Sequence, residues 1–155
     1  MPAPPPEADE LFDLYRECEH VLKRAGLIDP SRKRASVDWE AFARQLGDEF
    51  FHEMAASGEV GTLIAEPPRI LMRDSLTFEP PVPAPITDVV GLLVRGVCQV
   101  RHNYAHGEKF IGEGDFQRDT ALVRQALFVL TRAAERHEAF SAPPGASRET
   151  HIRPA

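Results

Sequence analysis

The stretch RHNYAHGEKF, residues 101–110, concentrates arginine, histidine and asparagine where an apolar helical pattern gives way to a glycine. Histidine can accept or donate a proton near neutral pH, because its unperturbed pKa is about 6.5. Arginine presents a planar fork of N–H groups that binds a phosphate through two parallel hydrogen bonds. Arg101 and His106 are therefore candidates for acid–base chemistry at a phosphodiester, and Asn103 is a candidate for orienting one of them.

The spacing of Arg101 and His106, Arg-x4-His, is not specific when taken alone. It recurs at Arg132 and His137, inside a continuous helical pattern where we expect no polar group to orient the imidazole. On an ideal helix each residue is rotated by about 100°, so Arg101 and His106 would diverge by about 140°. A shared site requires the chain to leave the helix after about Tyr104, which Gly107 permits.

Four amphipathic patterns predict the helices that must position these residues. Apolar side chains recur at three- and four-residue steps over about 7–25, 37–57, 86–104 and 119–137. The expected end and cap residues are Gly26 and Gly58 at C-termini, and Ser36 and either Thr87 or Asp88 at N-termini. Since no alternating strand pattern accompanies the helices, the predicted fold class is all-α, an up-and-down four-helix bundle.

One helical domain is expected over 7–140, between proline-rich tails at 1–6 and 141–155 that we predict to be disordered. The stretch 59–85 contains AEPPRIL and FEPPVPAP, and proline is not tolerated inside a helix. It is therefore predicted to be a long connection between the second and third helices, with a short strand or turn at LMRDSLTF. Its part 66–85 either covers the site as a lid or packs against the bundle.

The net charge of −6 excludes a general attraction to nucleic acid, because such binding is driven by Lys and Arg that neutralise phosphates. Local contact is left to 95–110 and to SRKR at 31–34, which we interpret as a solvated loop. No apolar run reaches the length of a membrane span and the N-terminus lacks the features of a signal peptide, so a cytoplasmic location is expected. Cys18 and Cys98 are interpreted as small buried hydrophobes.

Two Glu-x-x-His motifs, Glu17 with His20 and Glu49 with His52, raise the possibility of a di-iron carboxylate bundle. On a helical wheel both pairs point away from the apolar stripe of their helix, whereas metal ligands in a bundle must project inward. We therefore predict no metal site. We also predict no cofactor, since the sequence contains no Gly-rich phosphate loop, no Cys-x-x-Cys pair and no Gly-x-Ser-x-Gly elbow.

The stretch VRHNYAHGEKF resembles the VRNNLFHGGK type of sequence found in one branch of the HEPN superfamily, whose motif is R-x4-6-H on a helical bundle. The agreement covers Val100, Arg101, Asn103, His106, Gly107 and Lys109. His102 departs from the family, which usually has asparagine after the arginine. The resemblance extends loosely into the predicted fourth helix, where Phe128 lies on the polar side and is considered as a dimer contact.

The resemblance implies a metal-independent endoribonuclease in which the arginine and histidine of two protomers meet at a homodimer interface. Arg101, His106 and Asn103 are then the expected catalytic residues, with His102, Arg95 and Lys109 as weaker candidates for binding RNA. A role as a toxin or defence effector follows, with an antitoxin or regulatory protein as partner. Some HEPN toxins carry a tyrosine that a nucleotidyltransferase antitoxin modifies, and here Glu108 occupies its position.

Two alternatives stay open. The chain could be a non-catalytic HEPN module that dimerises or binds RNA or another partner, since fold does not establish activity. It could also be a helical partner-binding domain unrelated to HEPN, in which case the side chains of Arg101 and His106 would point apart.

Overall fold

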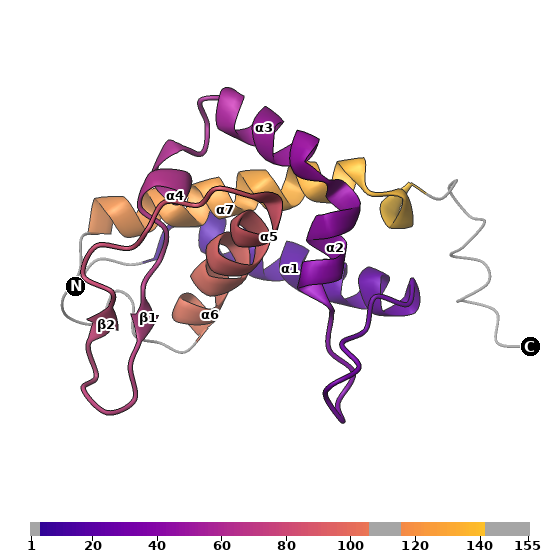
Figure 1. Ribbon diagram of the computed structural model, residues 1–155, viewed down its shortest axis with the longest axis horizontal. Coiled ribbons are helices and arrows are strands. Elements are labelled where there is room, and N and C mark those ends of the chain that lie inside the picture. Colours follow the sequence, from indigo (N-terminus) through magenta and orange to yellow (C-terminus); the bar gives the residue numbers. More distant parts are fainter. Residues whose placement is uncertain (1–3, 106–115, 142–155) are drawn as a thin grey trace, which may run out of the picture.

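The computed structural model describes residues 4–105 and 116–141. Helices predominate, and the only strands within the described residues form one short hairpin (Figure 1). The α-helices are α1 (Glu7–Arg24), α2 (Trp39–Leu46), α3 (Asp48–Ala56), α4 (Gly61–Ala65), α5 (Val89–Gly91), α6 (Gln99–Ala105) and α7 (Phe116–Arg136). The other elements are strands β1 (Ile70–Leu71) and β2 (Phe78–Glu79), the π-helix η1 (Leu92–Cys98) and the 3-10 helix η2 (Glu138–Phe140).

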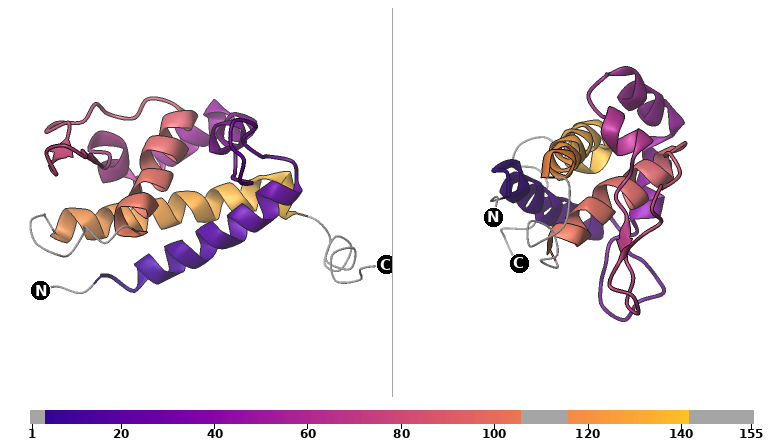
Figure 2. Two further views of the ribbon diagram at one scale, coloured as in Figure 1. Left: turned by 90° about the horizontal axis from the view of Figure 1, so that it is seen from below. Right: turned by 90° about the vertical axis from the view of Figure 1, so that its left-hand side faces the viewer.

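The two longest helices, α1 and α7, lie side by side and run in the same direction (Figure 2). Arg124 of α7 forms an ion pair with Glu7 in the first turn of α1. A strict up-and-down order would instead set the first and fourth helices antiparallel. The all-α class predicted from the sequence agrees with this structure, but the regular alternation of helix directions does not.

The first helix matches its prediction closely, because its C-terminal signal is local. Gly26 has φ +90°, a conformation that glycine adopts without strain. The N–H of Gly26 bonds to the carbonyl of Lys23 and that of Leu27 to the carbonyl of Leu22, the Schellman pattern that satisfies the last carbonyls of a helix. At the other end Pro5, which the sequence places in a disordered tail, is buried, and its carbonyl accepts a hydrogen bond from Ala8.

The second predicted helix is wrong as a continuous element. Gly47, with φ +82°, divides it into α2 and α3, and no side chain caps the start of α3. The predicted cap at Ser36 is also wrong, since Asp38 accepts the hydrogen bond from the N–H of Ala41. The apolar pattern continued through the break because both halves bury residues against the same core, and the period alone does not reveal the change of direction.

The third predicted helix is a composite of α5, η1 and α6. Asp88 caps its start by accepting a hydrogen bond from the N–H of Gly91, as predicted. The segment then continues as a π-helix and buries Leu92 and Gly96 together with Leu93 and Val97. Gly96 lies against the side chains of Leu63 and Ile86, which places α4 directly on this segment.

The stretch 59–85, predicted as a connection, contains the short helix α4, and its first part packs against the other helices. Its α4 is tied to α7 by the N–H of Leu63, which donates to the side chain of Gln125 at 2.8 Å. Two prolines, Pro67 and Pro68, are buried at the approach to β1. The predicted strand or turn at LMRDSLTF is an antiparallel hairpin, with Leu71 opposite Phe78.

One hydrophobic core joins all the helices. Its largest fully buried side chains are Phe42, Phe50, Leu11, Leu22, Leu63, Leu92, Leu93, Leu122 and Leu130. Within the described ranges, no helix combines the length and apolar character needed to cross a membrane. The two Glu-x-x-His motifs are exposed, as the helical wheels predicted, and the part of the chain that the structure describes gathers no three side chains suited to hold a metal.

Candidate functional site at the end of α6

Three of the predicted site residues, Arg101, His102 and Asn103, lie in the last turns of α6, which continues without interruption from the π-helix η1. The helix extends to Ala105, one residue beyond the predicted turning point, and carries Arg101, His102 and Asn103. His106 and Lys109 lie outside the described residues. The structure therefore describes the part of the candidate site around Arg101, together with the side chains that position Arg101 and the end of α6.

Arg101 is fixed by an aromatic ring from another helix. Its guanidinium carbon lies 4.7 Å from the centre of the Tyr15 ring of α1, a distance at which the cation is attracted by the face of the ring. Tyr15 is buried and stacks in turn on Trp39, with ring centres 4.7 Å apart. Arg101 itself is half-buried, so it is oriented by the protein while part of it faces solvent.

Asn103 is committed to the framework. It is 5% exposed, and its side-chain oxygen accepts a hydrogen bond from Gln99 at 2.8 Å. Its side-chain nitrogen donates to the backbone carbonyl of Arg69 at 2.9 Å, immediately before β1. The bond to Arg69 holds the hairpin against α6, the bond to Gln99 orients the amide, and neither involves Arg101.

The two weaker RNA-binding candidates in the described residues differ in their surroundings. His102 is exposed on α6. Arg95 is also exposed, but its guanidinium donates to the backbone carbonyl of Ala84 at 2.7 Å and thereby ties η1 to the proline-rich segment. Phe128, considered as a dimer contact, is half-buried against the core beneath Arg132, whose guanidinium carbon is 5.1 Å from its ring centre.

The start of α7 converges on the same region, which the sequence did not indicate. Arg118 donates to the backbone carbonyls of Glu66 and Pro67, at 2.7 and 3.0 Å. The pKa of Tyr104 is raised, mainly by burial and in addition by the negative charge of Asp119, a residue that is 4% exposed. The end of α6, the start of α7 and the turn before β1 thus meet in one place.

Neither cysteine offers a nucleophile. Burial is the main cause that raises the pKa of both the Cys18 and the Cys98 thiols to about 12. Both are free thiols and stay protonated near neutral pH; Cys18 is buried, as interpreted, whereas Cys98 is half-buried.

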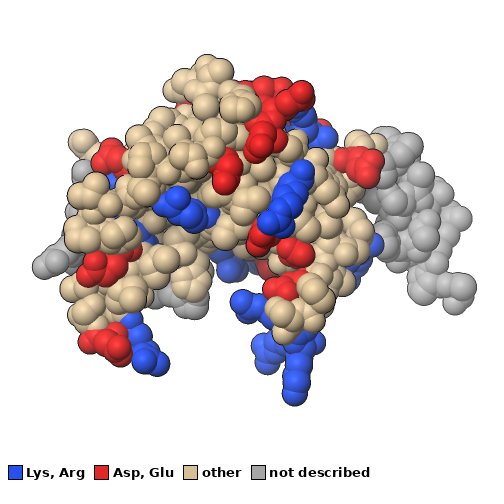
Figure 3. Space-filling model, viewed as in Figure 1, with Lys and Arg blue, Asp and Glu red and all other residues tan. Residues whose placement is uncertain are grey.

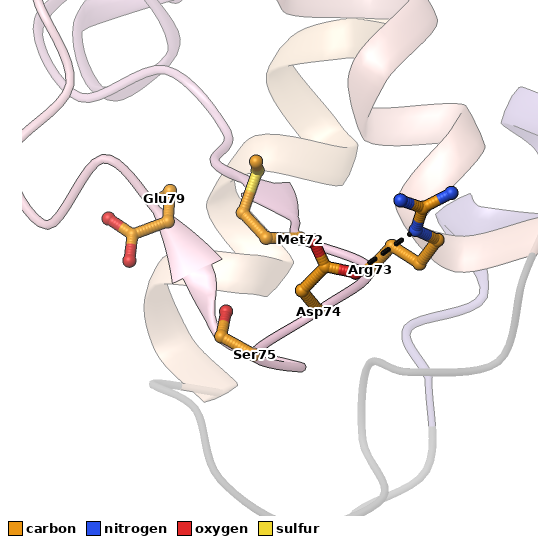
Figure 4. A pocket seen from close by; sticks show the side chains of 5 residues that line it. All are labelled: Met72, Arg73, Asp74, Ser75 and Glu79. Atoms are coloured by element: carbon orange, nitrogen blue, oxygen red, sulfur yellow. Dashed lines mark hydrogen bonds and ion pairs between the residues drawn. The ribbon is translucent and has the colours of Figure 1, made fainter.

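A shallow depression on the hairpin is separate from this region. Met72, Arg73, Asp74, Ser75 and Glu79 line it (Figure 4). Arg73 is paired with Asp74, and Glu79 points away from that pair, so the side chains do not converge on a common point. None of the predicted site residues contributes to it.

Some of the neighbours that complete the site had a signal in the sequence. Gln99 and Asn103 are four residues apart, the spacing at which amide side chains meet on one face of a helix. The pairing of Arg101 with Tyr15 joins residues that are distant in the chain, and no local pattern indicates it.

In comparisons with known proteins, the chain matches no family model, no curated protein and no solved structure.

Proposed function

We propose that the protein is a metal-independent endoribonuclease of HEPN type, acting at a site formed where the α6 ends of two protomers meet. The observation that carries the proposal is the position of Arg101. Its half-buried guanidinium is held on the Tyr15 ring in the last turns of α6, five residues before His106. A cation that is oriented and still reachable from solvent is what a phosphate-binding group requires.

In this proposal His106 moves the proton and Arg101 binds the phosphate. Cleavage of RNA through its own 2′-hydroxyl needs a base for the hydroxyl proton, an acid for the 5′-oxygen and cationic donors for the charged phosphorane. One protomer supplies one His106, whereas a two-fold dimer supplies two, one for each proton transfer. Asn103 takes the role of a positioning residue that fixes the end of α6 against the hairpin.

The arrangement proposed for the helices follows the same resemblance. In a four-helix bundle of HEPN type, α1, α2 with α3, η1 with α6, and α7 would take the four helical positions. The hairpin beside α6 exposes Ile70, Met72 and Leu76, apolar side chains that contact between protomers would cover. A cytoplasmic location, a role as a toxin or defence effector, and control by an antitoxin or regulatory protein complete the proposal.

A non-catalytic HEPN module is the second candidate, and one observation favours it. The amide of Asn103, a predicted catalytic residue, is bound to Gln99 and to the backbone of Arg69. A site whose polar groups serve the framework can persist for dimerisation or RNA binding without chemistry. The third possibility, a helical domain unrelated to HEPN, rests on the direction of the His106 side chain, which lies outside the described residues.

The decisive experiment is cleavage of labelled single-stranded RNA by the purified full-length chain in excess EDTA. We expect cleavage by the wild type and its loss in His106→Ala and Arg101→Ala. His20→Ala is the matched control, because His20 is an exposed histidine on α1. We also expect the rate per molecule to fall on dilution through the range where a dimer dissociates. Absence of cleavage by a folded dimer, across varied RNAs, would support the non-catalytic module.

A further inference from the structure

The loop between α1 and α2 projects from the body of the molecule and carries an unusual concentration of positive charge. It spans residues 29–36 and is called the basic finger here. It contains Arg32, Lys33 and Arg34, all exposed, and a single carboxylate, Asp29. Lys and Arg atoms gather visibly on this projection (Figure 3). The last turn of α1 adds Lys23 and Arg24 at its base.

The finger has a defined conformation. Ile28 and Val37 form an antiparallel bridge at its base, and the N–H of Asp29 donates to the carbonyl of Ser36 at 2.8 Å. The carboxylate of Asp29 accepts hydrogen bonds from both the N–H and the hydroxyl of Ser31. A loop closed in this way presents its tip with less conformational entropy to lose on binding.

The charges at the tip are available for a partner. Lys33 and Arg34 form no ion pair with any described residue, and Arg32 lies 3.6 Å from Asp29 with a side chain that is 70% exposed. Residues 23–36 hold five Lys and Arg against one Asp, a net charge of +4, in a chain of −6, so the other residues carry −10. Because of this separation of charge, the finger attracts a polyanion while the rest of the surface repels it.

The finger also lies on a relevant side of the molecule. Figure 1 shows that the basic finger and the β1–β2 hairpin project in the same direction. The C-terminal end of α6 points to the same side. The second view of Figure 2 agrees on these directions. The finger and the end of α6 thus face the same side of the molecule.

We propose that the basic finger binds the phosphate backbone of single-stranded RNA through Arg32, Lys33 and Arg34. This inference deepens the proposed function, on which it rests for the identity of the polyanion. The tip, SRKRA, carries no large apolar side chain of the kind that inserts into a lipid surface, whereas arginine forks fit phosphate oxygens. Binding by charge alone predicts little sequence preference and strong dependence on salt.

The test measures binding separately from cleavage. Labelled 2′-O-methyl RNA, which has no free 2′-hydroxyl to attack the phosphate, is titrated with the full chain by fluorescence anisotropy at several concentrations of KCl. For a single strand, each neutralised phosphate contributes about 0.7 to the slope of log K against log salt. The triple variant R32A/K33A/R34A should therefore lower that slope by about 2, and the R32K/R34K variant should retain it.

The matched control is R16A/R44A/R132A, which removes the same number of cations from helix surfaces. Each of these arginines is exposed and paired with a carboxylate three or four residues away, to Asp13, Glu40 and Glu135 respectively. We expect its salt slope to remain that of the wild type. A control that lowers affinity as much as the finger variant would overturn the inference, because the effect would then belong to net charge.

The outcomes separate this inference from the proposed function. RNA binding that depends on the finger, in a chain that cleaves no RNA, would support the inference and contradict the ribonuclease. Cleavage that persists with unchanged RNA affinity in the finger variant would contradict the inference alone. The inference would also be overturned if the wild type does not bind RNA. The same holds if the finger binds anionic vesicles and no RNA.

Discussion

Two Arg-x4-His pairs in this chain have the same spacing and different surroundings. Arg101 lies near the end of α6, half-buried on the ring of Tyr15, and His106 lies outside the described residues. Arg132 lies on the exposed surface of α7, over Phe128 and paired with Glu135 at 3.4 Å. Its partner in the motif, His137, is 7% exposed, so the arginine and histidine of the second pair do not share a surface.

His137 is better oriented than the sequence suggested. The prediction that nothing polar would orient its imidazole is wrong, because Nε2 lies 2.6 Å from the side-chain oxygen of Gln45. Nδ1 accepts a hydrogen bond from the N–H of Ala139, and the ring packs on Phe42 with centres 5.0 Å apart. Nε2 thus links the end of α7 to α2, and Nδ1 caps the start of η2.

A histidine that is held in a fixed orientation by the protein is not necessarily a catalytic one. An imidazole with both nitrogens bonded inside the protein stabilises the fold and has no nitrogen left for a substrate. Arg101 is oriented through the face of a ring, so its N–H groups are not consumed by that contact. Spacing does not distinguish the two pairs, but the surroundings of Arg101 and Arg132 differ.

The largest effect expected from this comparison is on catalysis. His106→Ala should lower the rate of RNA cleavage by about 100-fold or more, the contribution of a general acid or base, with unchanged stability. His137→Ala should lower the midpoint of urea unfolding and leave the rate per folded molecule unchanged. Equal loss of cleavage in the two variants, measured at a temperature where both are folded, would show that the comparison is mistaken.

The framework at Asn103 should give the next largest effect. Asn103→Ala leaves the Gln99 amide and the Arg69 carbonyl without their partner, and an unsatisfied buried group costs about 1–3 kcal/mol. Urea unfolding at neutral pH measures the loss, and amide hydrogen exchange of the β1–β2 hairpin should accelerate. Gln99→Ala, which removes one of the two bonds, is the graded control and should cost less. A hairpin that exchanges as slowly as in the wild type would contradict the anchoring role.

A pH-dependent effect of the same kind is expected at His137. Burial lowers the pKa of this imidazole from the ordinary value of 6.5, so the folded state binds its proton less tightly than the unfolded state. Its contribution to stability is therefore complete above pH 6.5 and is lost as the pH falls below that value towards the lower pKa of the folded state. The measurement is the midpoint of urea unfolding of the wild type and of His137→Gln, at pH values from about 7.5 to about 5. We expect the two midpoints to converge as the pH falls. A constant difference between the two would contradict the assignment.

The smallest effect concerns the contact between Arg101 and Tyr15. A double-mutant cycle with Arg101→Ala and Tyr15→Leu should give a coupling free energy of about 0.5–1 kcal/mol, typical of a cation on an aromatic face. Arg132→Ala with Phe128→Leu is the matched cycle and should give less, because Arg132 is the more exposed cation. A coupling at Arg101 no greater than at Arg132 would remove the argument that Tyr15 positions the site.

The parts of the fold that depend on neighbouring residues were predicted well. Gly26 ended α1 and Asp88 capped α5, because both signals act within one turn of backbone. The break at Gly47 was missed, since the apolar pattern is continuous across it and a glycine inside a helix is a weak signal. The π-helix η1 was missed because the spacing that predicts an α-helix is preserved on its buried side.

The sequence by itself determined most of the helical segments, although not α4 or the break at Gly47, and that Arg101, His102 and Asn103 share one helix end. These properties follow from hydrophobic period and local capping, which act over a few residues. Only the tertiary structure decided that Tyr15 lies under Arg101, that Asn103 holds the hairpin and that His137 is bound to Gln45. The physical reason is that each contact joins distant segments, and the packing of the whole core determines which distant side chains meet.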